Sequence, residues 1–390
     1  MNYELTVEQE QFRQEVGEFL AASCTPHEWD YWDLGPEEQL EHRAMALKLG
    51  AKGWLGLSWP TQYGGLSRSR IEAVLLQEQL AYYGNPGVNR AAVSLIGPAL
   101  LNFGSEAQKA QHLPGIASGR TFWSQGFSEP GAGSDLAAVS TRAVREGSDY
   151  IINGQKIWTS FANKAEWIFV LARTGDTASR HKGLSYLLTP LDAPGIRVRP
   201  IRHMAGFQPF CEVFFDDVRV PEAQRLGAEN AGWAVAMGTL SDERSGVEYS
   251  GASRRILHDL QAYCAAIRWR SQREHDGVAN RLARLAVEVE AARLMAYRVT
   301  WMQAAGEDVS GHAAMSKVFG SELMGRLAAV AMQLVSSHAP LAPAGRWASL
   351  EARLRREYMA VLGRITAAGS SEIMRNIIAT RGLRLPASPR

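Results

Sequence analysis

Apolar positions in the first third of the chain recur with the period of an amphipathic helix. Phe12, Val16 and Leu20 are four residues apart, and Thr6 stands where a hydroxyl would cap the first turn of the helix that contains them. Three more helices are expected, over residues 71–83, 93–101 and from Ser105 to a point before Pro114.

The pattern changes near residue 122 to short apolar runs that are typical of strands. Two such runs, 150–152 and 156–158, flank the dipeptide Asn153-Gly154, which is a strong hairpin signal. We therefore predict a tight turn there, with Trp158 and Ser160 on one face of the second strand because side chains alternate along a strand. Further strands are expected at residues 167–171, 184–188, 196–198 and 213–215.

Long helices return after Trp233, each with one apolar stripe. The first stripe consists of Leu282, Leu285, Val289, Ala292, Ala296 and Val299. The second consists of Phe319, Leu323, Leu327, Val330 and Leu334. Long helices with short connections pack best as an antiparallel bundle. The pattern predicts an α+β fold with an N-terminal helical domain (1–121), a central antiparallel β domain (122–230) and a C-terminal four-helix bundle (231–390).

Composition narrows the class of protein. With 390 residues, 46% hydrophobic and 21% charged, the chain should form two or three packed sub-domains. The net charge of +2 does not favour nucleic acid as a partner. Three scattered cysteines and an acidic N-terminal segment without a signal-peptide pattern indicate the cytoplasm. No membrane span is expected, since no apolar run approaches the ~20 residues that one requires.

Five blocks of the sequence resemble those of the acyl-CoA dehydrogenase family, in the family's order. They are SEPGAGSD at 128–135, YIINGQKIWTS at 150–160, EVFFDDVRVP at 212–221, GAENAGW at 227–233 and GSSEIMRNIIATRGL at 369–383. The resemblance covers nearly the whole chain. It implies the acyl-CoA dehydrogenase fold, FAD as cofactor and α,β-dehydrogenation of an acyl-CoA thioester.

The resemblance also implies contacts to the flavin. Gln125, Phe127 and Ser128 would meet the pyrimidine edge of the ring, Trp158 would flank it, and the Ser160 hydroxyl would hydrogen-bond N5. Residues Gly133 and Ser134 of the same glycine-rich loop are further cofactor contacts, and Ser134 is also a substrate contact. Without the resemblance, Trp158 could equally be an ordinary aromatic residue of a sheet core and Ser128 a simple loop cap.

A carboxylate base must remove the α-proton of the substrate. In many family members it lies just before the glycine of the C-terminal motif, where this chain has Ala368. Some relatives instead place the base on the first bundle helix before an arginine, which here gives Glu243 before Arg244. We predict Glu243 as the base, Arg244 as a CoA contact, and the backbone at Ala368 and Gly369 as substrate contacts.

These charged residues could also have purely structural roles. Glu243 could be a solvated acid near a helix start, Arg244 could form a surface ion pair, and Glu372 is expected to be a structural acid at a helix N-terminus.

The chain departs from the family pattern where relatives hold the FAD diphosphate. An Arg-x-x-Phe-Gly signature is absent, and Arg268, Arg270 and Arg273 replace it by charge only; Arg270 is our choice. The expected Gln-x-x-Gly-Gly turn begins at Gln333, but serines at 336 and 337 replace its glycines. These departures resemble a bacterial branch that acts on bulky or steroid-side-chain thioesters, in which some members assemble two different subunits.

The resemblance implies an electron-transfer flavoprotein as electron acceptor and a homotetramer or heterotetramer built from dimers. Two alternatives stay open. The chain could be a non-catalytic or half-site partner subunit of a hetero-oligomeric dehydrogenase, or it could catalyse an oxidase reaction or a non-redox elimination on the same fold. No metal is expected, because histidines, cysteines and carboxylates lack metal-ligand spacing.

Overall fold

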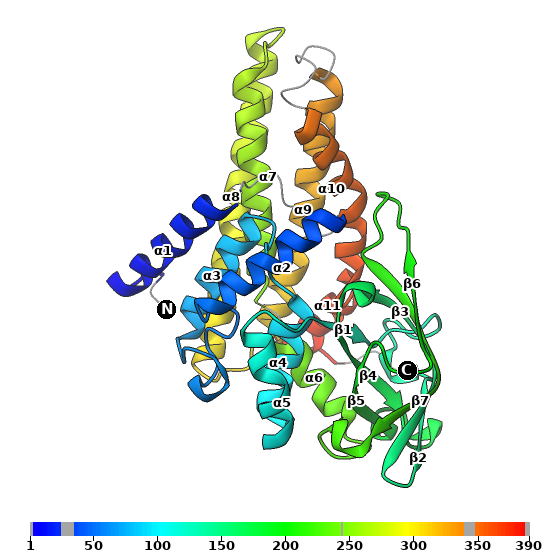
Figure 1. Cartoon of the computed structure of the whole chain (residues 1–390). Coiled ribbons are helices and arrows are strands. Elements are labelled where there is room, and N and C mark those ends of the chain that lie inside the picture. The colour runs from blue at the N-terminus through cyan, green and yellow to red at the C-terminus, as the bar shows by residue number, and fades with distance from the viewer. Residues whose placement is uncertain (1–2, 25–34, 243–244, 339–347, 387–390) are drawn as a thin grey trace. The chain divides into compact units, whose positions relative to one another are not determined.

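A computed structural model describes residues 3–24, 35–242, 245–338 and 348–386 of the chain. The chain forms two compact units (Figure 1). One draws on Met1–Tyr31, Ser69–Pro86 and Arg244–Arg390, and the other on Trp32–Arg68 and Gly87–Glu243. The expected fold class, helices followed by a central sheet and a helical bundle, is confirmed.

The first unit is helical. Its helices are α1 (Val7–Ser23), α3 (Arg70–Tyr82), α7 (Val247–Ala266), α8 (Gln272–Ala304), α9 (Ser310–His338), α10 (Ala348–Thr366) and α11 (Ser371–Ile377). Thr6 caps α1 as predicted, since its hydroxyl accepts a hydrogen bond from the Gln9 backbone and the Gln9 side chain accepts one from the Thr6 backbone. Helices α7 to α10 lie side by side (Figure 1). The whole predicted stripe of α8 is buried there, and that of α9 is buried except for the partly buried Phe319.

The second unit contains the sheet. Its helices are α2 (Pro36–Ala51), α4 (Gly97–Phe103), α5 (Glu106–Ala117) and α6 (Gly232–Asp242). Its strands are β1 (Trp123–Gly126), β2 (Arg142–Glu146), β3 (Asp149–Ser160), β4 (Trp167–Arg173), β5 (Leu184–Pro190), β6 (Ile196–Ile201), β7 (Phe210–Pro221) and β8 (Arg225–Leu226). They form one sheet in the order β6-β7-β3-β2-β4-β5-β8, with β1 added beside β4. Most neighbours are antiparallel as predicted, but β1 pairs with β4 in parallel, and so does one residue of β2.

Two local predictions were wrong. Helix α5 continues through Pro114 to Ala117. Proline lacks a backbone N–H, but this removes only one hydrogen bond of the helix. The Ser118 backbone N–H donates to the Pro114 carbonyl at 3.1 Å and so closes the last turn. Asn153-Gly154 is not a hairpin turn either. The chain reverses at residues 147–148, where Glu146 pairs with Asp149, and β3 then runs on through the dipeptide.

A β-bulge explains why the dipeptide lies inside a strand. The register of β3 against β7 shifts between Ile152 and Gly154, and Gly154 has a φ of 148°. The Asn153 amide and Asp217 of β7 exchange two hydrogen bonds, both of 2.9 Å. The Asn-Gly pair therefore fastens β3 to a strand that is distant in sequence.

One stretch of α9, Ser310–Val335, is long and apolar enough to cross a membrane by length and composition, contrary to the expectation that no run approaches that length. Of its most apolar window, 56% is buried inside the structure, as is usual for the core helix of a bundle. The cysteines at 24, 211 and 264 are free thiols.

Replacing Gly154 with alanine should destabilise the sheet. A Cβ at this position would lie 2.7 Å from the Thr141 hydroxyl and 2.8 Å from its Cα, on a backbone that disfavours side chains. We expect Gly154→Ala to lower the free energy of unfolding by about 1–3 kcal/mol in urea denaturation. The control Gly277→Ala, in α8 with open space around it, should leave stability unchanged or raise it by up to about 1 kcal/mol. Equal losses in both variants would contradict the role of the bulge.

Candidate functional site

The loop after β1 is fastened to β3 along its first half. The Ser124 hydroxyl donates to the Ser160 carbonyl at 3.0 Å, and the Ile157 backbone donates to the Ser128 carbonyl at 2.9 Å. Glu129 and Ala132 exchange two backbone hydrogen bonds of 3.0 Å, which closes a tight turn. The loop then comes to the surface, where Gly133 and Ser134 are exposed. Residues 124–128 and the end of β3, which carry the predicted flavin contacts, are thus brought together.

A buried ion pair lies beneath this loop. The Lys156 ammonium is fully buried and lies 2.8 Å from the Glu129 carboxylate, whose side chain is 6% exposed. The same ammonium donates to the Phe127 carbonyl at 3.0 Å. Glu129 also accepts hydrogen bonds from the Ser140 and Thr141 backbones at 2.7 and 2.9 Å. One cation and one anion therefore join β3 to both ends of the loop.

The two charges perturb each other's protonation. Burial opposes ionisation of Glu129, but Lys156 and the hydrogen bonds from residues 140–141 outweigh it and lower the pKa of the carboxyl to about 2. Burial lowers the pKa of the Lys156 amine to about 8, against the attraction of Glu129. At neutral pH the pair is therefore ionised.

Trp158 stands out on the surface of the sheet unit. Its side chain is 55% exposed, and its backbone has a φ of 60°, which is rare for a residue with a side chain. The indole meets the Phe210 ring edge-on at 6.0 Å. A second register shift in β3, between Lys156 and Thr159, interrupts the alternation from which we predicted a common face for Trp158 and Ser160. The bulge turns Trp158 outward, so it is not a core residue of the sheet.

Three polar side chains on the segments that meet here, residues 124–128 and the end of β3, have unused hydrogen-bonding capacity. Gln125, Ser128 and Ser160 are partly buried, and their side chains make no hydrogen bond to any other residue that the structure describes. Phe127, between two of them in sequence, is buried. We give one name, the Trp158 face, to the set of residues Gln125, Phe127, Ser128, Trp158 and Ser160 on these joined segments. A flat aromatic side chain next to free amide and hydroxyl groups suits a planar heteroaromatic ligand.

In the helical unit, the turn between α10 and α11 has an unusual backbone. Ala368 is exposed with a φ of 54°, and Gly369 follows with a φ of 92°. Ser370 then caps α11. The exposed Glu372 lies in the first turn of α11, where backbone hydrogen bonding lowers the pKa of its carboxyl, as expected for a structural acid.

Helix α9 anchors this turn from both sides. The buried Lys317 ammonium donates to the Ile365 carbonyl at 2.8 Å, at the end of α10. Glu322 accepts hydrogen bonds from Ser371 at 2.9 Å and from Arg375 at 2.6 Å. The backbone at Ala368 and Gly369 is therefore held in place from α9.

The residues predicted at the diphosphate end of the cofactor lie elsewhere in the helical unit. Arg268 and Arg270 are exposed between α7 and α8, and the exposed Arg273 lies in the first turn of α8. Gln333 was predicted to begin a turn, but α9 continues to His338, because serines permit the helix that paired glycines would weaken. The Gln333 side chain accepts a hydrogen bond from Arg281 at 2.6 Å. Glu243 and Arg244 lie outside the described residues.

Sequence analysis missed the buried cations. Lys156 and Glu129 belong to two quoted motifs, yet neither was considered as an ion pair. A lysine within an otherwise apolar strand was the available signal. Arg173, at the end of β4, was also overlooked; its buried guanidinium donates to the carbonyls of Ala137 at 2.7 Å and Arg180 at 2.6 Å.

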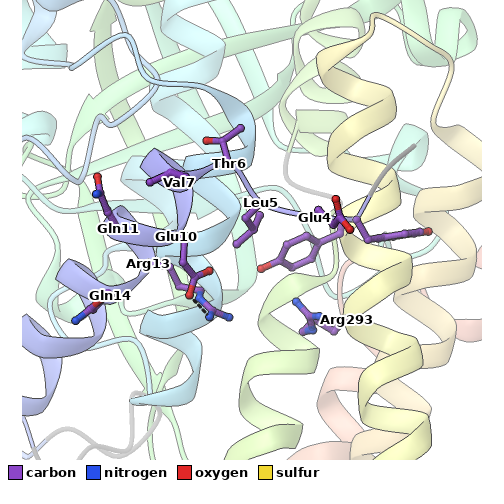
Figure 2. A pocket seen from close by; sticks show the side chains of 11 residues that line it. Glu4, Leu5, Thr6, Val7, Glu10, Gln11, Arg13, Gln14 and Arg293 are labelled. Atoms are coloured by element: carbon purple, nitrogen blue, oxygen red, sulfur yellow. Dashed lines mark hydrogen bonds and ion pairs between the residues drawn. The ribbon is translucent and has the colours of Figure 1, made fainter.

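A separate hollow of about 510 Å³ lies in the helical unit (Figure 2). The N-terminal segment and α1 line it together with Arg293 and Tyr297 of α8. None of the predicted site residues lines it, so we do not assign the chemistry to this hollow. Among the described residues, no group of three or more histidines, cysteines and carboxylates is arranged to hold a metal ion.

Comparison with known proteins points to one family. Sequence models of the acyl-CoA dehydrogenase N-terminal, middle and C-terminal domains match residues 6–120, 124–218 and 230–383. The chain is 38% identical over 347 residues to acyl-CoA dehydrogenase IpdE1 of Mycobacterium tuberculosis, covering 89% of this chain and 88% of the relative.

Two solved structures are similar over the full length of both chains. The Tcur3481-Tcur3483 steroid ACAD has a TM-score of 0.87 at 29% identity. The ChsE4-ChsE5 complex from Mycobacterium tuberculosis has a TM-score of 0.87 at 31% identity.

The variant Glu129→Gln tests the buried ion pair through the pH dependence of stability. The pKa of Glu129 is depressed from its ordinary 4.5 to about 2 in the folded chain. The carboxylate therefore contributes stability that is present above about pH 4.5 and is lost as the pH falls towards 2. At pH 7 we expect the variant to be about 3–5 kcal/mol less stable than the wild type in urea unfolding. This difference should shrink across the window from pH 4.5 to 2, and a constant difference would show that Glu129 is not the stabilising anion.

Proposed function

The chain belongs to the acyl-CoA dehydrogenase family, and on that premise we propose which of its residues carry the FAD-dependent dehydrogenation of an acyl-CoA. The family is one of flavin-dependent oxidoreductases, and when bound the flavin supplies the acceptor for the hydride that leaves the β-carbon. The residues of this chain bind the ring, hold the thioester and remove the α-proton.

The Trp158 face is the proposed seat of the flavin ring. The observation that carries this proposal is the presence of three polar side chains without partners among the described residues, on the same joined segments as an exposed indole. Gln125, Phe127 and Ser128 would meet the pyrimidine edge, and Ser160 would serve N5. Trp158 would cover one side of the ring. The exposed Gly133 and Ser134 would contact the cofactor further along the loop, and Ser134 also the substrate.

We assign proton abstraction to Glu243. The corresponding family position in the C-terminal motif is Ala368, which has no group that can accept a proton. The Ala368 and Gly369 backbone would instead hold the thioester oxygen, where negative charge develops as the α-proton leaves. The anchoring of this turn to α9 supports that role, because preorganised donors need no rearrangement during the reaction. Arg244 is proposed as a CoA contact.

Arg270 and Gln333 are the proposed contacts at the diphosphate and adenosine end of the cofactor. Both side chains are exposed on the helical unit and thus accessible to a ligand. An electron-transfer flavoprotein in the cytoplasm is the proposed electron acceptor. The solved relative described as a steroid ACAD supports a bulky acyl group as substrate.

Glu243→Gln should abolish reduction of the bound flavin by substrate. Loss of a general base costs about 10²–10⁴-fold in rate, whereas the isosteric amide should leave the flavin bound. The measurement is anaerobic bleaching of the flavin spectrum by a panel of short, branched, long and ring-bearing acyl-CoAs. Glu372→Gln is the control and should bleach at the wild-type rate. If Glu243→Gln is reduced as fast as the wild type, the base lies elsewhere.

A second candidate function is that of a partner subunit that completes a hetero-oligomeric dehydrogenase. It is favoured by the missing Phe-Gly signature, by the serines at 336 and 337, and by the solved relatives whose descriptions name two proteins. The intact Trp158 face indicates that even then this chain would hold the flavin ring.

Expression of the chain alone and together with a neighbouring homologue separates the two candidates. A self-sufficient enzyme should be purified yellow in both cases, with about one flavin per chain. A half-site subunit should be colourless alone and yellow only in the complex. Flavin content by absorbance, together with subunit composition, decides between them.

A further inference from the structure

Hydrogen bonds fix the backbone on both sides of the peptide group between Phe127 and Ser128. Lys156 donates to the Phe127 carbonyl at 3.0 Å, and Ile157 donates to the Ser128 carbonyl at 2.9 Å. The next residue, Glu129, is engaged through both backbone groups with Ala132. The backbone N–H and the hydroxyl of Ser128 make no hydrogen bond to any residue that the structure describes. The surrounding bonds therefore fix the position of the backbone that carries these two donors of the Trp158 face.

Lys156 holds this peptide in place and also polarises it. A positive charge on a carbonyl oxygen polarises the whole amide, and the N–H of that amide then becomes a stronger donor. The amide whose oxygen receives the Lys156 ammonium is the one whose N–H belongs to Ser128. Glu129 holds the ammonium in place from the other side at 2.8 Å.

We propose that Lys156 is a positioning residue for the cofactor, which orients and strengthens the Ser128 donors that meet the pyrimidine edge of the flavin. This role rests on the proposed function, since it takes the flavin as the ligand of the Trp158 face. Lys156 does not touch the ligand in this proposal; it acts through Phe127 and Ser128.

Stability alone is a weak reason for such a lysine. A buried ion pair loses its hydration, and apolar side chains of similar volume are often as stable in its place. The strand around Lys156 packs against apolar neighbours, so methionine could fill the same space. The bond to the Phe127 carbonyl is what methionine could not supply.

Arg173 offers a matched control. It is a second buried cation of the same unit, and its guanidinium donates hydrogen bonds to the backbone carbonyls of residues 137, 139 and 180. Arg173 interacts with Glu129 and Lys156 through its charge, but it makes no hydrogen bond to the amide between Phe127 and Ser128. Removing it should therefore destabilise the unit and leave the bond from Lys156 to the Phe127 carbonyl in place. The comparison of Lys156→Met with Arg173→Met thus separates cofactor positioning from general loss of stability.

The experiment measures three properties of each full-length holoprotein, purified with any subunit that it needs for flavin loading. They are the dissociation constant of FAD, the visible absorption bands of the bound flavin, and the thermal midpoint. We expect Lys156→Met to weaken FAD binding by about tenfold or more beyond the change in Arg173→Met, as for a lost charge-assisted hydrogen bond. Its absorption bands should also shift, whereas Arg173→Met keeps the wild-type bands.

Equal dissociation constants and equal spectra in the two variants would overturn the positioning role, while a flavin-loaded wild type would leave the proposed function intact. A wild type that binds no FAD alone or in complex would overturn the proposed function itself. If Lys156→Met does not fold, Lys156→Gln carries the same comparison, because it removes the charge and retains a hydrogen-bond donor.

Discussion

The loop after β1 and the strand that carries Trp158 depend on one buried pair of charges, Lys156 and Glu129. Neither could be left in an apolar interior alone, because an unpaired buried charge costs several kcal/mol. The two charges therefore pair with each other, and their ion pair joins the middle of β3 to the loop after β1. This connection holds the loop after β1 against the strand that carries Trp158 and Ser160.

Each of the two units has a residue other than glycine with a positive φ at a proposed functional position. Trp158 on the sheet unit and Ala368 on the helical unit both have a positive φ without being glycine. Such backbone is strained by about 1–3 kcal/mol and persists only where neighbours enforce it. The enforcing neighbours are the bulge in β3 for Trp158, and Lys317 and Glu322 of α9 for the turn at Ala368. Strain that is held this firmly is typical of positions where geometry matters more than stability.

Regular elements were predictable from sequence because their signals are local and repeated. The stripe from Leu282 to Val299 is one example, since each residue confirms the period of the others. The prediction of a hairpin turn at Asn153-Gly154 was wrong because the Asn153 side chain bonds to Asp217, which is too distant in sequence for a local pattern to include. The prediction of a turn at Gln333 was wrong because it assumed the family's paired glycines, whereas this chain has serines at 336 and 337 and helix α9 continues through them. The motifs predicted flavin contacts on two segments that the structure joins, and these contacts stay predictions. The ion pair beneath the loop could not be predicted in the same way, because it depends on the register of two segments that are distant in sequence. The role of Glu243 stays a prediction.

The glycine-rich loop carries two ion pairs that differ in their exposure to solvent. The Lys156–Glu129 pair at its root is buried, whereas Arg180 and Asp135 at its far end are 49% and 57% exposed. Dissolved salt weakens the attraction between exposed charges, with a screening length of about 8 Å at physiological ionic strength, and it weakens the attraction between buried charges far less. Ionic strength should therefore loosen the outer end of the loop and leave its root unchanged. A protein built this way can tolerate changes in its ionic surroundings without losing the shape of the surface around Trp158.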